Sequence, residues 1–211
     1  MSSKCVCVMS GSFSPPTLGH LHLLALARDH LIKDKGFTSV KALFLPTNSA
    51  YPKPGLAPSS DRVAMCKLLA EEDEWIDVET FDADQDHWVD LLTSLRYIQQ
   101  KYPDCHIFFV CGADLVLRWN EDVWPDEEVL TILDDFGVCM ASRTESIESV
   151  VEKVPILKGH LQNTVLITDN LLSEVSSTRV REYIANGRSP LGLISGPVYH
   201  YLKDNHLLGY P

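Results

Sequence analysis

Short apolar runs alternate with amphipathic segments along the whole chain. The short runs predict β-strands, and segments with apolar residues three or four positions apart predict helices between them. We expect strands at residues 5–11, 39–47, 75–81, 106–114, 136–143 and 164–170. We expect helices at residues 18–32, 60–72, 88–102, 176–187 and 196–208.

This alternation predicts an α/β fold in which helices cover both faces of a mainly parallel sheet. The sequence has no internal repeat and no linker, so we expect a single domain over residues 1–211 with a helical C-terminal portion at about residues 173–211. Ligands of such folds bind at the carboxyl ends of the strands. The Pro- and Ser-rich loop at residues 46–61 follows a predicted strand and is therefore a candidate binding loop.

Composition and charge narrow the class of partner. A net charge of −11 disfavours nucleic acid and anionic membranes, because both favour a basic surface. No apolar run reaches the roughly 18–20 residues needed to cross a bilayer, and the N-terminal residues show no signal-peptide pattern. We therefore expect an intracellular protein, in the cytoplasm or the nucleus, with the cytoplasm favoured. Six cysteines without a CxxC pair indicate reduced, buried thiols and not a metal site.

The segment GSFSPPTLGH joins the first predicted strand to the first predicted helix. Gly11 permits close approach of a ligand to the main chain, and the two prolines keep the following backbone extended. Thr17 is a favourable N-cap, which places His20 in the first turn of the helix. The free amides and the helix dipole favour an anion there, to which the imidazole can donate a hydrogen bond. A strand-to-helix turn with a solvated histidine is the alternative.

A later segment, EVSSTRVREYIANG, predicts a second helix start with free amides. Ser176 or Ser177 can cap this helix. Arg181 follows Ser177 by four residues and Thr178 by three, so it lies on the face of those hydroxyl groups, whereas Arg179 points elsewhere. Because a guanidinium group suits phosphate oxygens, we expect Arg181, and not Arg179, to bind phosphate. A solvated, N-capped surface helix is the alternative.

Both motifs resemble those of known nucleotidyltransferases. The first is similar to the GxFxPxHxGH signature whose histidines hold ATP phosphates, with Thr17 where many members have the first histidine. The second resembles the SSTxxR motif of the nicotinamide and nicotinate mononucleotide adenylyltransferases, whose eukaryotic members also match the pattern around Thr17. The shorter stretches AYPKPGL, GADL, EDVW and MASR extend the resemblance over the full chain.

The resemblance implies a Rossmann-like nucleotidyltransferase fold and an activity in NAD biosynthesis. AMP would pass from ATP to nicotinamide mononucleotide, nicotinate mononucleotide or both, giving NAD or deamido-NAD and pyrophosphate. Mg²⁺ is the implied cofactor, bound mainly through the ATP phosphates and not at a metal site of the protein.

The resemblance also implies which residues form the site. His20 and Arg181 are the implied catalytic residues. The implied ATP-binding residues are Gly11, Ser12, Phe13, His20, Gly112, Asp114, Ser177, Thr178 and Arg181, and the implied mononucleotide-binding residues are Ser12, Phe13, Lys53, Phe81, Trp124 and Arg143. Phe81 stands where human-like members have a tryptophan. Either Thr168 or Asn170 would supply an asparagine-like contact.

Other functions remain as alternatives. One is adenylyl or cytidylyl transfer to another phosphate, such as phosphopantetheine or glycerol phosphate. Another is a nucleotide-binding or chaperone-like protein without turnover. An aminoacyl-tRNA synthetase is disfavoured because the chain is short, acidic and without a KMSKS-like loop. The sequence leaves open the choice between the amide and the acid mononucleotide, and a homo-oligomer is one alternative for the assembly.

Overall fold

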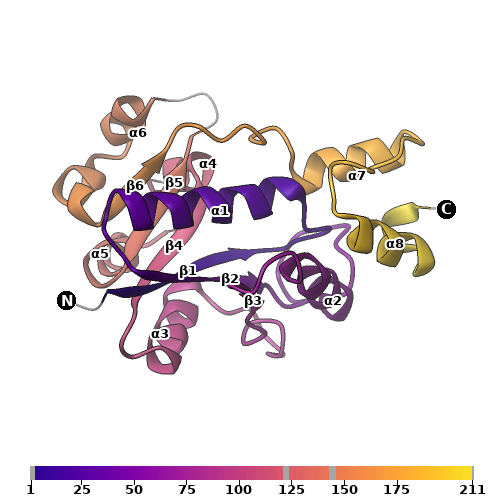
Figure 1. Ribbon diagram of the computed structural model, residues 1–211, viewed down its shortest axis with the longest axis horizontal. Coiled ribbons are helices and arrows are strands. Elements are labelled where there is room, and N and C mark those ends of the chain that lie inside the picture. Colours follow the sequence, from indigo (N-terminus) through magenta and orange to yellow (C-terminus); the bar gives the residue numbers. More distant parts are fainter. Residues whose placement is uncertain (1–2, 121–123, 143–145, 211) are drawn as a thin grey trace. The chain divides into compact units, whose positions relative to one another are not determined.

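The computed structural model describes residues 3–120, 124–142 and 146–210, in which strands and helices alternate (Figure 1). The strands are β1 (Lys4–Gly11), β2 (Ser39–Pro46), β3 (Ile76–Val78), β4 (His106–Gly112), β5 (Gly137–Ala141) and β6 (Thr164–Ile167). The α-helices are α1 (Leu18–Lys33), α2 (Ser59–Ala70), α3 (Leu91–Lys101), α4 (Ala113–Val116), α5 (Asp126–Asp135), α6 (Ile147–Lys153), α7 (Ser177–Ala185) and α8 (Gly196–Asp204). Short 3-10 turns are η1 (Leu117–Asn120), η2 (Pro155–Gly159), η3 (Leu161–Asn163) and η4 (Leu207–Gly209).

The six strands form one sheet in the order β3-β2-β1-β4-β5-β6. Strand β1 pairs in parallel with β4, which pairs in parallel with β5, and β5 pairs in parallel with β6. The chain therefore builds the sheet outward from β1 in one direction and then returns to β1 to build it in the other. The switch in strand order lies between β1 and β4, and in such folds the ligand crevice lies beyond the carboxyl ends of the strands at that point. The predicted α/β fold with a parallel sheet is confirmed.

The chain divides into two compact units. Unit 1 consists of residues 1–9, 23–42 and 90–171, and unit 2 consists of residues 10–22, 43–89 and 172–211. The expectation of a single domain over 1–211 therefore stays a prediction. Every motif residue from Gly11 to His20 and from Ser176 to Arg181 belongs to unit 2.

The core of unit 1 is a stack of buried strand residues. Strand β5 is buried along its whole length, and helices α3 and α5 pack against each other and against β4 and β5 respectively. Gly137 is required there, because a Cβ atom would lie 2.2 Å from the ring of Phe108 on the neighbouring strand. Cys7 and Cys139 are buried free thiols, as the sequence predicts, and burial raises the pKa of both well above the ordinary value.

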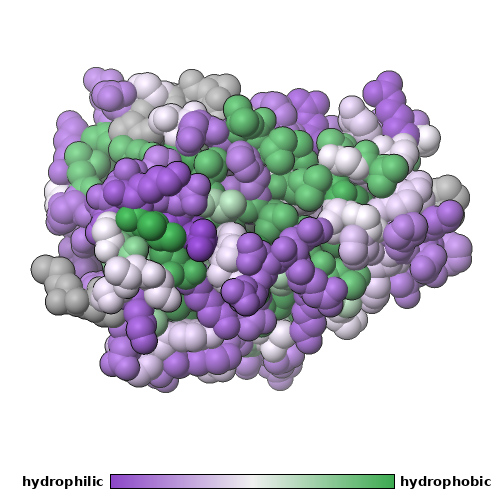
Figure 2. Space-filling view, viewed as in Figure 1, coloured by the Kyte–Doolittle hydropathy of each residue, from purple (hydrophilic) through white to green (hydrophobic). Residues whose placement is uncertain are grey.

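Helix α1 is covered around most of its circumference, and Lys33 is its first exposed residue. This fits its sequence, in which leucine and alanine occur on nearly every side of the helix. Apolar residues are visible among hydrophilic ones on the face of the molecule that Figure 2 shows.

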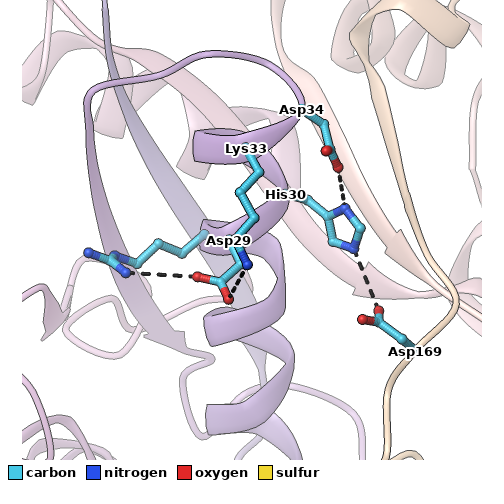
Figure 3. Close-up of polar contacts among 6 residues, drawn as sticks. Asp29, His30, Lys33, Asp34 and Asp169 are labelled. Atoms are coloured by element: carbon cyan, nitrogen blue, oxygen red, sulfur yellow. Dashed lines mark hydrogen bonds and ion pairs between the residues drawn. The ribbon is translucent and has the colours of Figure 1, made fainter.

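The C-terminal end of α1 is tied to the segment that follows β6 (Figure 3). His30 lies between two carboxylates, with Nδ1 2.5 Å from Asp34 and Nε2 3.5 Å from Asp169. Asp169 stands between Thr168 and Asn170, the two candidates for the asparagine-like contact. The imidazole of His30 therefore helps to hold that segment in place.

Three segments are helical without having been predicted as such: α4 with η1, α5 and α6. Helix α5 begins at the acidic run Asp126–Glu128, and acidic residues favour the first turn of a helix. Helix α6 has a cap at Ser146, whose side chain accepts a hydrogen bond from the backbone N–H of Ser149. Helices α4 and α6 have only four and seven residues, so their periodicity is weak. No helix among the described residues is long and apolar enough to span a membrane.

Unit 2 combines the end of β2, strand β3 and the helices α2, α7 and α8. Helix α2 packs against α8 and β3, and the hydroxyl of Tyr201 on α8 donates a 2.9 Å hydrogen bond to Asp61 on α2. The helical C-terminal portion predicted from about residue 173 corresponds to α7, α8 and η4.

Candidate active site

Strand β1 ends in a sharp turn that is packed with aromatic side chains. Gly11 accepts a 3.0 Å hydrogen bond from the backbone N–H of Thr47, and a Cβ atom on it would lie 3.3 Å from the ring of Phe13. Phe13 has φ of +43°, which a bulky residue adopts only where its surroundings hold it. Its buried ring meets His20 edge-on at 5.2 Å and Phe44 at 5.3 Å between centroids. The turn is therefore held by packing on both sides.

Thr17 caps α1, as the sequence predicts, and also fixes the imidazole of His20. The backbone N–H of His20 lies 3.4 Å from the Thr17 hydroxyl, in the position of a cap contact. The backbone N–H of Thr17 donates a 3.0 Å hydrogen bond to Nδ1 of His20, and the hydroxyl of Thr17 lies 2.8 Å from the same nitrogen. A nitrogen that accepts from an N–H carries no proton, so the ring is the neutral tautomer with its hydrogen on Nε2. His20 is thus prepared to donate a hydrogen bond from Nε2.

The start of α7 lies directly against this turn. The hydroxyl of Ser177 donates a 2.8 Å hydrogen bond to the carbonyl of Pro15, and the hydroxyl of Thr17 lies 3.3 Å from the carbonyl of Val175. Gly19 permits the approach, because a Cβ atom there would lie 2.1 Å from the Val175 carbonyl oxygen. Two segments that are more than 150 residues apart in the sequence therefore form one surface.

The structure distinguishes the two serines that could cap α7. Ser176 is the cap, since its hydroxyl accepts a 3.3 Å hydrogen bond from the backbone N–H of Arg179. Ser177 instead ties the helix to the turn after β1 through its bond to the Pro15 carbonyl.

Arg181 faces the turn after β1 and Arg179 faces away, as their spacing on the helix predicts. The Arg181 guanidinium donates 2.8 Å to the carbonyl of Ser14 and 3.4 Å to the hydroxyl of Thr178. The side chain of Arg179 is 59% exposed and pairs with Glu174 at 3.2 Å. Of the two arginines at the start of α7, only Arg181 contacts the turn after β1, whereas Arg179 contacts Glu174.

Lys53 brings a second positive charge close to Arg181. Partial burial of its ammonium group and, to a smaller extent, the charge of Arg181 lower the pKa of Lys53 below the ordinary value for lysine. A lysine and an arginine that repel each other in this way favour an anion between them. Phe81, the other predicted mononucleotide-binding residue of unit 2, follows β3, and its backbone N–H donates 3.2 Å to the carboxylate of Glu79.

The remaining predicted site residues belong to unit 1 or lie outside the described residues. Gly112 ends β4 and Asp114 lies in the first turn of α4, where its carboxylate fills the space beside Gly112. The indole of Trp124 packs at a tilt of 55° against the buried Trp119, with 6.4 Å between ring centroids. Arg143 is outside the described residues. The contact of these side chains with the nucleotides stays a prediction.

Sequence reasoning missed Arg62, a fully buried residue of α2 that donates to the turn after β1 and to the loop after β2. A signal was present in the sequence. Arg62 shares a helix face with Met65, Cys66 and Leu69, which are all buried, so a charged residue stands on the apolar face of a predicted helix.

The chemistry of unit 2 is that of a polyanion site. Helix starts, the imidazole of His20 and the side chains of Lys53 and Arg181 supply donors and positive charge. Over residues 3–120, 124–142 and 146–210, no group of three or more His, Cys, Asp or Glu side chains could hold a metal ion. The donors and positive charges of His20, Lys53 and Arg181 suit phosphate groups.

Comparison with known proteins gives consistent matches over most of the chain. The family model described as cytidylyltransferase-like matches residues 8–183. A nicotinamide/nicotinic acid mononucleotide adenylyltransferase of Arabidopsis thaliana is 30% identical over 212 residues, which cover 96% of this chain and 89% of the relative. The protein of the same name from Oryza sativa subsp. japonica is 29% identical and is covered over 85% of its length by 96% of this chain.

A solved structure has a similar fold. Plasmodium falciparum nicotinic acid mononucleotide adenylyltransferase complexed with NaAD matches with a TM-score of 0.71 at 17% identity, over 99% of this chain and 98% of that chain. This likeness supports the fold.

Proposed function

Because the chain belongs to the nicotinamide/nicotinic acid mononucleotide adenylyltransferases, within the cytidylyltransferase-like family, we propose that it transfers AMP from ATP to a pyridine mononucleotide. The products are the dinucleotide and pyrophosphate. The observation that carries this proposal is the contact between the turn after β1 and the start of α7, where Arg181 meets the Ser14 carbonyl. This contact joins, in one unit, two helix starts to which we assign phosphate groups.

The reaction needs no general base. The nucleophile is a phosphate oxygen of the mononucleotide, which is mostly ionised at neutral pH because the second pKa of such a phosphate is about 6. The difficulty lies in holding two polyanions in line and stabilising the charge of the leaving pyrophosphate. Fixed donors and cations are the groups that do this.

We assign the β- and γ-phosphates of ATP to His20, Arg181 and the start of α7 with Ser177 and Thr178. The neutral His20 donates from Nε2, so that it stabilises the leaving group without a proton transfer. The guanidinium of Arg181 gives two parallel donors to the leaving pyrophosphate. Gly112 and Asp114, at the end of β4, are assigned to ATP through the resemblance alone.

The acceptor phosphate is assigned to the turn after β1 and to Lys53. Gly11, Ser12 and Phe13 bring backbone groups close to the ligand, and Lys53 adds positive charge. Phe81, Trp124 and Arg143 are assigned to the mononucleotide by resemblance, with Trp124 stacking on the pyridine ring.

Mg²⁺ fits this arrangement as an ion that arrives with ATP. When bound, it supplies neutralisation of phosphate charge. The described residues offer donors and cations and no cluster of carboxylates, so phosphate oxygens and water would hold the ion. A cytoplasmic or nuclear location, a homo-oligomeric state and the absence of nucleic-acid partners remain predictions.

A substrate panel tests the proposal. The protein is incubated with ATP and Mg²⁺ and, in separate reactions, with nicotinamide mononucleotide, nicotinate mononucleotide, phosphopantetheine and glycerol phosphate. Dinucleotide and pyrophosphate are then measured by chromatography. We expect equal amounts of both products with one or both pyridine mononucleotides. Product with phosphopantetheine or glycerol phosphate alone, or ATP binding without pyrophosphate release, would overturn the proposal.

A further inference from the structure

Arg62 is a fully buried arginine whose hydrogen-bond acceptors are all uncharged. Its Nε donates to the carbonyl of Ala57 at 3.0 Å, its Nη1 to the carbonyl of Ser12 at 2.7 Å and the hydroxyl of Thr47 at 3.4 Å, and its Nη2 to the carbonyls of Thr47 at 2.6 Å and Asn48 at 3.1 Å. A buried charge needs partners, and an arginine is commonly paired with a carboxylate. Here a set of backbone carbonyls and one hydroxyl takes that place, and burial lowers the pKa of the guanidinium below the ordinary value for arginine.

These bonds join three segments that meet at the site. Ser12 lies in the turn after β1, Thr47 and Asn48 follow β2, and Ala57 precedes α2. The loop that contains Lys53 runs from the second of these segments to the third. Arg62 therefore fixes both ends of that loop and joins them to the turn.

The same bonds set the direction of backbone amides. In a trans peptide the C=O and the next N–H point in opposite directions. Because the carbonyls of Ser12, Thr47 and Asn48 point at the guanidinium, the N–H groups of Phe13, Asn48 and Ser49 point away from it. In the part of the chain that the structure describes, none of these three N–H groups has a protein acceptor.

Two of the three amides belong to buried residues, since Phe13 and Asn48 are each only 2% exposed. Buried amides without an acceptor are rare in proteins, so a ligand or water is needed to complete them. The φ of +43° at Phe13 shows that the peptide is held in an unusual direction. These features indicate that the directions of the Phe13, Asn48 and Ser49 amides depend on Arg62.

We propose that Arg62 is the positioning residue of the acceptor-phosphate site: it orients the amides of Phe13, Asn48 and Ser49 and holds the Lys53 loop toward the phosphate of the mononucleotide. This inference rests on the proposed function. Arg62 is buried behind the backbone and acts through other groups, without touching the substrate itself.

The proposal predicts different effects of a change at Arg62 on the binding of the two substrates. The groups assigned to ATP are held by bonds that do not involve Arg62, namely Ser177 to the Pro15 carbonyl and Arg181 to the Ser14 carbonyl. A change at Arg62 therefore acts first on the acceptor-phosphate site and leaves in place the groups assigned to the β- and γ-phosphates of ATP, although the resemblance also assigns Ser12 and Phe13 to ATP.

The test is Arg62→Lys, which keeps a positive charge but replaces three donor nitrogens spread over a plane by one. We expect the KM for the mononucleotide to rise at least tenfold and the KM for ATP to rise by a clearly smaller factor. Hydrogen exchange of the amides of Tyr51 and Lys53, which donate to the carbonyls of Asn48 and Tyr51, should become faster. Equal changes in both KM values, or no change in either, would overturn the proposal.

Leu69→Ala is the matched control, because Leu69 is a buried residue of the same helix that is not a partner of Arg62. It should lower the Tm while both KM values stay within twofold of wild type. If Arg62→Lys does not fold, Thr47→Val removes one acceptor only, and we expect a threefold rise in the mononucleotide KM. An unchanged KM in that variant would contradict the proposal.

The exchange measurement separates this inference from the proposed function. Should the wild-type protein form no dinucleotide, the proposed function fails, yet faster exchange of the Tyr51 and Lys53 amides in Arg62→Lys would still show that Arg62 orders the loop. If the wild-type protein is active and Arg62→Lys has the same exchange rates and the same kinetics, the inference about Arg62 is wrong while the proposed function stands.

Discussion

The guanidinium of Arg181 donates a 2.8 Å hydrogen bond to the backbone carbonyl of Ser14, 167 residues earlier in the chain. This bond has two effects. It holds the start of α7 against the turn after β1, and it fixes the guanidinium, whose charge acts on Lys53, without neutralising that charge. The positive charge of Arg181 therefore remains available to a phosphate.

The two arginines of α7 should behave differently. We expect Arg181→Ala to lower kcat/KM by about 10²–10³, which is the cost of about 3 kcal/mol for one lost transition-state contact. Arg179→Ala is the matched control, since its exposed side chain only pairs with Glu174 and such surface pairs contribute about 0–1 kcal/mol. Steady-state measurements of kcat/KM for both variants test this difference. The reverse order of effects would show that the assignment of helix faces is wrong.

His20 should matter for turnover and not for folding. We expect His20→Ala to lower kcat by about 10²–10³, because a preorganised donor to the leaving phosphates is lost. His200→Ala, an exposed histidine of α8, should leave kcat unchanged. Circular dichroism and Tm would show that both variants fold. Near-normal turnover of the His20 variant would remove this residue from the mechanism.

The lowered pKa of Lys53 predicts that the mononucleotide binds more weakly at alkaline pH. Its pKa is below the ordinary lysine value, so on raising the pH it loses its proton earlier than a free lysine, and with it the charge that attracts phosphate. We therefore expect the KM for the mononucleotide to rise with pH below the ordinary lysine pKa. Binding an anion favours the charged form, so binding at such pH should take up protons, which calorimetry in two buffers measures.

Lys53→Arg is the control for that experiment, because arginine keeps its charge over the whole range. Its KM should stay flat with pH even if its value differs from wild type. A wild-type profile as flat as that of the variant would show that Lys53 does not face the phosphate.

Gly19 should tolerate no side chain. Alanine normally favours a helix over glycine by about 1 kcal/mol, but its Cβ would lie 2.1 Å from the Val175 carbonyl oxygen, a backbone atom that cannot rotate away. We expect Gly19→Ala to lower the free energy of unfolding by at least about 1–3 kcal/mol. Gly159→Ala, with no atom within 4 Å of its Cβ, is the control. Urea denaturation measures both, and a stable Gly19 variant would contradict the packing described.

The features that local periodicity determines were predictable. The N-cap at Thr17 and the inward face of Arg181 both follow from the spacing of residues on one helix, and both are confirmed. The family resemblance and the parallel α/β fold are also confirmed. The roles of the site residues with substrates stay predictions.

The features that tertiary contacts determine were not predictable. No sequence pattern indicates that the partner of Arg181 is the carbonyl of Ser14, since every residue has a carbonyl group. The positive φ of Phe13 was hidden because that region normally favours glycine or asparagine. Arg62 was overlooked because a buried guanidinium depends on acceptors from three segments that only the fold brings together.

The contact between Ser177 and the carbonyl of Pro15 also bears on how the protein is made. During synthesis the start of α1 leaves the ribosome early, and the start of α7 leaves it only when most of the chain has been made. No nascent fragment that ends before α7 can hold the triphosphate as proposed here, so nucleotide binding would begin only after α7 has left the exit tunnel.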